Sequence, residues 1–280
     1  MGQTITDIAT KHYQNQELKK ARKLIDSAIT IEKHKKDPYT WQLRGYIYKE
    51  LFKNSEEPQR SEHREKGISS FKKALNKGAE GRIKNASRKG LIYLGQSCYN
   101  DAMKRLDTSS TKGPIQLYER YISVMKRIGK DSSALKKDMI GFYNSLGVVY
   151  MSIYESEREH DQETFDRAIE TFGKVLDMDS SNYLANYNSG IMYYNRGVQI
   201  AQKIDPSNMS VQLKKVKKLQ KKSTKKFKDA LPYMKEAHEQ RPKRLETLEG
   251  LSGIYYSLNE EKKSQHYKDL KKKIIKQRKR

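Results

Sequence analysis

The side chains that could bind a metal or catalyse a reaction are few in this chain, and they are scattered. None of the six histidines falls at a His-Glu-x-x-His spacing, which would place two imidazoles around a zinc ion. The single cysteine, Cys98, excludes an intrachain disulfide and a cysteine-based metal site. The glycines are spread singly, so a Gly-rich phosphate loop and a Gly-x-Ser-x-Gly nucleophile elbow are both missing. We therefore expect no catalytic residue, no metal, no cofactor and no enzyme.

Two of these features have a structural interpretation. The acidic cluster between residues 155 and 163 alternates carboxylates without the Asp-x-Asp-x-Asp-Gly order of a calcium loop, so a solvated helix end is favoured. Cys98 falls where a small side chain packs between two helices. We expect its thiol to be buried and unreactive.

Charge is a stronger signal than any of these side chains. The formal net charge is +24, and it is uneven: residues 1–130 carry +14, residues 131–210 carry −5 and residues 211–280 carry +15. Two basic regions thus flank an acidic one. Such a field attracts polyanions, either nucleic acid or the headgroups of anionic lipids.

The densest basic segment holds nine lysines and no acid, and the segment 268–280 is a second, weaker one. Two interpretations stay open. Lysine is a strongly hydrated point charge that suits a solvated helix face, whereas this density of positive charge also suits a run of phosphates. The predicted basic patch consists of Lys214, Lys215, Lys217, Lys218, Lys221, Lys222, Lys225, Lys226 and Lys228.

Small and aromatic residues recur along the chain at the spacing of a helical hairpin. The predicted hairpins position the charged and polar side chains described above. The clearest copy has Gly147 and Tyr150 on its first helix and Ala168 and Phe172 on its second. Small residues let the two helices approach closely, and aromatic residues fill the space between stacked hairpins. Six copies fit a register of about 34 residues with insertions, the first through Ala9, Ala21, Ile25 and Ala28.

The six copies span residues 2–35, 38–81, 88–136, 140–181, 183–244 and 245–270, and a basic C-terminal tail follows at 271–280. Several copies contain insertions, for which lengthened paired helices are the simplest account. Turn-forming residues place the hinges of these hairpins at 54–58, 107–114, 157–162 and 205–210.

At these positions the chain resembles the tetratricopeptide repeat (TPR) family. The lengthened helices look similar to TPR proteins of the Bacteroidota, chiefly from Ala230 through Pro242 to Tyr256. The resemblance implies an all-α fold, a right-handed α-solenoid of about six helix-turn-helix hairpins forming a single domain over residues 1–280. It also implies a concave groove, lined by the first helix of each hairpin, that holds a peptide.

The groove predicted from this resemblance is rich in tyrosine and side-chain amides, which offer flat apolar contact together with hydrogen bonds. An individual tyrosine could instead pack against the next hairpin. The carboxylate clamp that some TPR proteins use for chaperone tails is absent, since Thr6 and Thr10 stand in place of its Lys and Asn. The predicted groove residues are Tyr13, Tyr39, Gln42, Tyr46, Lys49, Lys89, Gln96, Tyr99, Asn100, Asn144, Tyr187, Tyr194 and Asn195.

The predicted function is therefore that of a non-enzymatic scaffold that binds an extended segment or helix of a partner protein, with an acidic partner favoured by charge. The alternative is a nucleic-acid or anionic-surface binder that uses the segments 214–228 and 268–280. No run approaches 18 apolar residues, so no membrane span is expected. The expected location is the cytoplasm, or the periplasm if an export signal has been removed in front of this sequence. The sequence predicts no oligomeric state.

Overall fold

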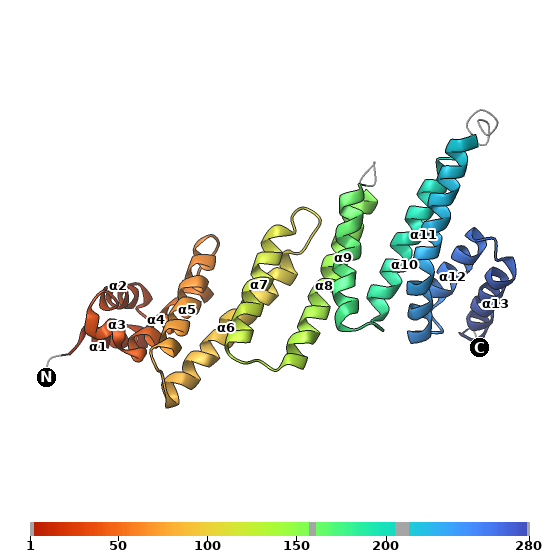
Figure 1. The fold of residues 1–280 in the computed structure, drawn as a ribbon. Helices are drawn as coiled ribbons and strands as arrows, with labels where there is room; N and C mark the ends of the chain where they lie inside the picture. Colours follow the sequence, from red (N-terminus) through yellow and green to blue (C-terminus); the bar gives the residue numbers. More distant parts are fainter. Residues whose placement is uncertain (1–2, 157–160, 205–212, 279–280) are drawn as a thin grey trace. The chain divides into compact units, whose positions relative to one another are not determined.

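The structure is a computed structural model that describes residues 3–156, 161–204 and 213–278. In these ranges the chain forms thirteen α-helices and no strand, so the all-α prediction is confirmed (Figure 1). The helices are α1 (Ile5–Gln14), α2 (Leu18–Ala28), α3 (Glu32–Lys36), α4 (Pro38–Lys53), α5 (Gln59–Asn76), α6 (Gly81–Arg105), α7 (Lys112–Arg127), α8 (Ser132–Ser156), α9 (Gln162–Met178), α10 (Tyr183–Gln202), α11 (Leu213–Gln240), α12 (Leu245–Ser257) and α13 (Glu261–Arg278).

All of these helices except α3 pair into hairpins, as the repeat register predicts, and this makes the chain an α-solenoid. The pairs are α1 with α2, α4 with α5, α6 with α7, α8 with α9, α10 with α11, and α12 with α13. We call the first helix of each pair helix A and the second helix B. Contacts divide the chain into unit 1, residues 1–105 and 112–135, and unit 2, residues 106–111 and 136–280. A single domain remains a prediction.

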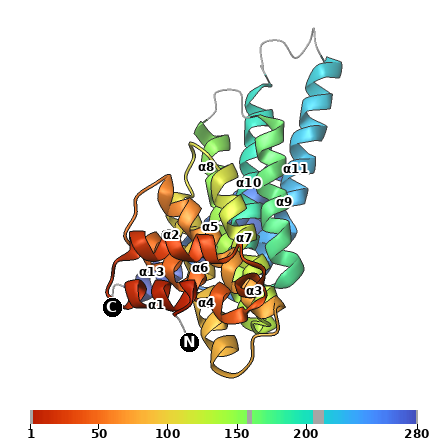
Figure 2. The ribbon, with the colours of Figure 1, turned by 90° about the vertical axis from the view of Figure 1, so that its left-hand side faces the viewer.

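The lengthened helices are confirmed. Helices α6 and α8 each have 25 residues, α10 has 20 and α11 has 28. At 1.5 Å per residue, α11 is about 42 Å long. Within unit 2, both views show the N-terminal end of α11 standing clear of the α12–α13 hairpin (Figures 1 and 2).

The hinge predicted at 54–58 matches the segment between α4 and α5. The hinge predicted at 107–114 is too long, because α7 already begins at Lys112. Pro114 did not prevent this, since it lies in the first helical turn, where its missing N–H has no intrahelical partner to lose. For the last two predicted hinges, residues 157–160 and 205–210 lie outside the described ranges.

The structure differs from the predicted register at several points, among them the fourth copy, which begins with α8 at Ser132 instead of residue 140. The short helix α3 was not predicted; it lies beside α4, where the Trp41 indole N–H donates to the Lys35 carbonyl at 2.8 Å. The third copy begins at Gly81 instead of residue 88, because α6 has two extra N-terminal turns. Residues 271–278 are not a separate tail, since α13 continues through them and buries Ile274. Residues 279–280 lie outside the described ranges.

In the four hairpins α4–α5, α6–α7, α8–α9 and α10–α11, a large helix-B side chain lies against a helix-A glycine. The ring of Phe71 on α5 packs on Gly45 of its own hairpin and on Gly90 of the next one. In unit 2, Phe172 packs on Gly147 in the same way. A Cβ built on Gly147 would lie 2.5 Å from Cε1 of Phe172, which is too close for any real contact. Glycine is therefore required at these positions because of the close approach of the helices.

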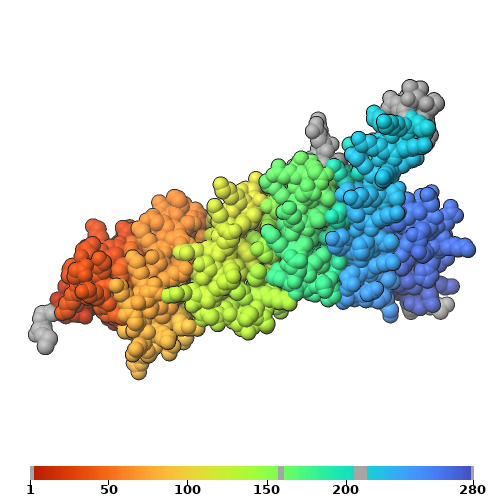
Figure 3. Space-filling model, in the orientation of Figure 1, coloured from red at the N-terminus to blue at the C-terminus, as the bar shows by residue number. Residues whose placement is uncertain are grey.

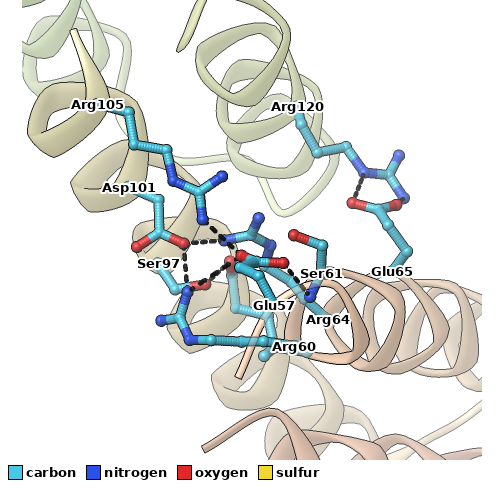
Figure 4. A network of polar contacts seen from close by, with 10 residues as sticks. Glu57, Arg60, Ser61, Arg64, Glu65, Ser97, Asp101, Arg105 and Arg120 are labelled. Atoms are coloured by element: carbon cyan, nitrogen blue, oxygen red, sulfur yellow. Dashed lines mark hydrogen bonds and ion pairs between the residues drawn. The ribbon is translucent and has the colours of Figure 1, made fainter. Parts of the chain in front are cut away.

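A buried ionic network ties α5 to α6 in unit 1 (Figure 4). The Asp101 carboxylate accepts hydrogen bonds from both Arg60 and Arg64, each at 2.6 Å. Arg64 is only 1% exposed, and its guanidinium carbon lies 5.6 Å from the centre of the Phe52 ring. Burial raises the pKa of Asp101, but the two arginine hydrogen bonds lower it more, so the pKa lies below its usual range. The ionised carboxylate is thus the native form.

We predict that Gly147→Ala lowers the stability of the fold. The added methyl group must displace the Phe172 ring, and overpacking of this kind costs about 1–3 kcal/mol. The matched control is Gly173→Ala on α9, where a Cβ meets nothing within 4 Å and alanine is the better helix former. Denaturant unfolding followed by circular dichroism measures both variants. Equal midpoints for the two would contradict the packing argument.

We also predict that Asp101→Asn destabilises the protein by about 3 kcal/mol at neutral pH, because it leaves the buried Arg64 without its counter-charge. The pKa of Asp101 is lower in the folded protein than in the unfolded chain. The difference in free energy of unfolding between the wild-type protein and the variant is therefore largest above about pH 4, and it shrinks as the pH falls through the folded pKa. Unfolding curves across this pH range test the effect. Glu119→Gln, an exposed site in the same unit, is the control with the same charge change and should show no such loss.

Candidate functional site

The predicted groove residues on α4 are held in place by contacts with the first turns of α6. The Tyr46 hydroxyl donates to the Ala86 carbonyl at 3.1 Å, and the Tyr46 ring meets Phe71 edge-on at 5.2 Å. The Gln42 amide donates to the Ile83 carbonyl at 3.2 Å. Gln42 is buried by this contact, so it positions the α4–α6 face and does not line its surface.

One exposed tyrosine lies close to two ammonium groups on this face. Lys49 Nζ is 5.4 Å and Lys53 Nζ is 5.3 Å from the centre of the Tyr93 ring, and both contacts are cation–π interactions. The single carboxylate of Glu50 lies within 3.2 Å of Lys49 Nζ and 3.0 Å of Lys53 Nζ. Two positive charges therefore share one negative charge beside an aromatic ring.

Helix α6 extends this surface with a stripe of side chains three or four residues apart. Lys89 is exposed, Ile92 is 46% exposed and Tyr93 is 44% exposed. Further along the stripe, the Gln96 amide donates to the Asn100 side chain at 3.4 Å. We call the group Tyr46, Lys49, Lys53, Lys89, Ile92 and Tyr93 the tyrosine–lysine surface.

The other predicted groove residues of unit 1 pack between helices. Tyr13 lies half-buried against the core of the first hairpin, and burial raises its pKa. The Tyr39 hydroxyl shares a hydrogen bond with Thr10 at 3.1 Å. The Tyr99 ring lies 5.1 Å from Tyr121 of α7. These three tyrosines stabilise the packing of helices and are only partly exposed.

The same holds in unit 2, where the structure brings together no comparable surface from the predicted groove residues. Asn144 is buried and donates to the Asn182 side chain at 3.2 Å. Tyr187 stacks on Tyr183 with ring centres 5.8 Å apart. Tyr194 packs against Phe227 on α11, and Asn195 is half-buried. The groove of unit 2 thus remains a prediction.

Sequence reasoning missed Lys53 and Tyr93, which are central to the tyrosine–lysine surface. Tyr93 stands one residue away from the groove positions carried over from the TPR family. The available signal was its helical spacing, since Tyr93 follows Lys89 by four residues and precedes Gln96 by three. Lys53 follows Lys49 by four residues in the same way.

The lysine segment of α11 is a second candidate surface. Eight of its nine lysines are exposed. The ninth, Lys226, is half-buried, and its Nζ lies 5.0 Å from the centre of the Tyr193 ring and 4.0 Å from the Asp229 carboxylate. The other eight form no ion pair with the described residues. Positive charge is therefore concentrated on this helix without local neutralisation.

Within the described ranges, no cluster of three histidine, cysteine or acidic side chains could hold a metal ion. In the same ranges, no helix has the length and apolar character needed to cross a membrane. Part of the acidic cluster and one of the histidines considered above lie outside the described residues. These are Glu157, Glu159 and His160.

No protein-family model and no curated protein matches this chain in sequence. Among solved structures, it is similar to the human IFIT1 dimer with m7Gppp-AAAA, at 16% identity and a TM-score of 0.35 over 93% of this chain. A monomeric IFIT1 mutant with Gppp-AAAA matches at 16% identity and a TM-score of 0.28, also over 93% of this chain. A circular tandem repeat protein matches at 12% identity and a TM-score of 0.23 over 97% of it. The chain spans 57% of the length of the two IFIT1 chains and 62% of the third.

We predict that Cys98 does not react with Ellman's reagent in the folded protein. Burial raises the pKa of its thiol to about 11, so very little thiolate is present at mildly alkaline pH. Unfolding in guanidinium chloride should release the single thiol for stoichiometric reaction. Rapid reaction of the native protein at the rate of a free thiol would contradict the buried position.

Proposed function

We propose that the chain is a non-enzymatic TPR-like scaffold that binds an acidic peptide segment on the tyrosine–lysine surface. The observation that carries this proposal is the exposed Tyr93 ring within 5.4 Å of the ammonium groups of both Lys49 and Lys53, next to the exposed Ile92. Membership of the TPR family, including its elongated Bacteroidota-like variant, is part of the proposal.

Charge favours an acidic ligand over a neutral one. Glu50 balances only one of its two lysine neighbours, and Lys89 adds a further positive charge on α6. Carboxylates of a partner can pair with these lysines at the rim, where ion pairs mainly raise the association rate and select against basic partners.

The apolar part of the surface supplies the binding free energy. Tyrosine is enriched among the residues whose loss weakens protein interfaces most, because it buries a large flat area at a low cost in entropy. Ile92 and Tyr93 are both exposed on α6, so both add apolar area that a partner can cover. The amides of Gln96 and Asn100 lie further along the same stripe, where they can pair with the backbone of an extended segment.

Peptide display against the full chain tests the proposal. We expect selected peptides to combine several acidic residues with an apolar one, and their affinity to fall about tenfold or more in the double variant Ile92→Ser, Tyr93→Ala. Ile31→Ser is the matched control, because Ile31 is 45% exposed in the same unit but lies outside the surface.

Fluorescence polarisation with the selected peptides gives the affinities, and thermal unfolding confirms that each variant is folded. Selection without enrichment of acidic residues, or equal affinity for the wild-type protein and the double variant, would refute the site.

A further inference from the structure

The first half of α11 carries a positive field that its surroundings do not neutralise. The helix has no acidic residue before Asp229, and its partner α10 has none at all. Eight lysines between Lys214 and Lys228 are exposed and form no ion pair with the described residues. An anionic ligand would find these charges unpaired.

The packing of α11 turns its lysines outward. Its buried stripe runs through Val216, Ser223 and Phe227, which are spaced for one helix face. The Ser223 hydroxyl donates to the Gly197 carbonyl at 2.9 Å, and Phe227 packs against the same glycine. With this face fixed on α10, the lysines occupy the remaining circumference. Figure 3 shows that the N-terminal turns of α11 project beyond the neighbouring α12–α13 hairpin of unit 2.

Two neighbouring hollows lie along this helix, and we call them together the track. Among the described residues, the first hollow, of 730 Å³, is lined by α11 from Lys217 to Lys228. The second, of 830 Å³, lies among α9, α10 and α11 and reaches Glu236. Lys225 and Lys228 line both hollows, so the hollows are adjacent. From Lys217 to Tyr233 the track is about 24 Å long at 1.5 Å per residue.

The second hollow contains an aromatic platform. Tyr193 and Tyr233 stack with ring centres 5.8 Å apart and planes inclined by 9°, and both line the hollow. The carboxylates of Asp229 and Glu236 line it as well. These carboxylates repel a phosphate but can accept hydrogen bonds from the amino group of a base. The track therefore changes from phosphate-attracting to base-attracting along its length.

We propose that this track binds single-stranded nucleic acid, with phosphates along Lys217, Lys221, Lys225 and Lys228 and an unstacked base on Tyr233. Basic grooves with aromatic side chains on which bases stack are the means by which single strands are bound without sequence preference. A duplex keeps its bases stacked, so it can use the lysines but not the tyrosine platform. An anionic membrane likewise presents only headgroups to the lysines. The site is independent of the tyrosine–lysine surface of unit 1.

The test is fluorescence anisotropy of the full chain with a labelled single-stranded RNA of about 12 nucleotides. Changing the four track lysines to glutamine should weaken binding about 100-fold and lower the slope of log affinity against log salt by about 3, since each phosphate contact contributes about 0.7. Tyr233→Leu should weaken single-strand binding about tenfold and leave duplex binding unchanged.

The control changes four exposed lysines of α13, Lys262, Lys272, Lys273 and Lys276, to glutamine, which removes the same net charge. It should weaken binding less than about threefold. An equal loss in both quadruple variants would overturn the proposal, because net charge alone would then explain binding. Equal affinity for single strand, duplex and phosphatidylserine vesicles, or an unchanged affinity in Tyr233→Leu, would overturn it too. Thermal unfolding of each variant verifies that it is folded.

Discussion

The stacking of hairpins depends on the contact between a helix-B side chain and the backbone of helix A. Phe71 touches Gly45 in its own hairpin and Gly90 in the next. In unit 2, Met234 spans Gly190 and Gly250 in the same way. One side chain thus closes a hairpin and also sets the position of its neighbour. Within each unit, neighbouring hairpins therefore stabilise one another, as in repeat proteins whose repeats contact only their neighbours.

This packing decides which surfaces are left for function. The face of helix A that carries the glycine packs against helix B, so the side chains of any binding surface must lie on its other faces. On α6 these are Lys89, Ile92 and Tyr93, while Gly90 and Leu91 point into the core. Many tyrosines on helix A already pack against neighbouring helices, as Tyr99 does against α7. Tyrosine content alone is therefore a poor guide to a groove, and the exposed fraction of each ring separates the two roles.

The hairpin register was predictable because close helix contact demands particular residue sizes at particular spacings. Ala9, Ala21, Ile25 and Ala28, which place the first copy, are all buried, and Gly147 meets Phe172 as their spacing suggests. Contacts between residues of different helices were harder to predict from the sequence. The pairing of Arg64 with Asp101 joins residues 37 apart whose meeting depends on how α5 and α6 lie together.

The candidate site was only partly predictable for the same reason. The family geometry places Tyr46 and Lys49 on helix A, but the meeting of Lys53 with Tyr93 depends on the distance between α4 and α6. The lysine segment was visible in the sequence, whereas the tyrosine platform beside it was not, since Tyr193 and Tyr233 come from different helices.

The charge pattern of α11 works against the stability of the helix that carries it. Lys214 and Lys218, Lys217 and Lys221, and Lys221 and Lys225 are four residues apart, and like charges at this spacing destabilise a helix by about 0.2–0.5 kcal/mol per pair. On α13, by contrast, Lys263 pairs with Glu260 and Lys271 with Glu249. Hydration of a surface does not require this repulsion, because mixed charges achieve it without the penalty. The packing of Val216, Ser223 and Phe227 on α10 offsets the cost and keeps the unpaired charges on one rigid element.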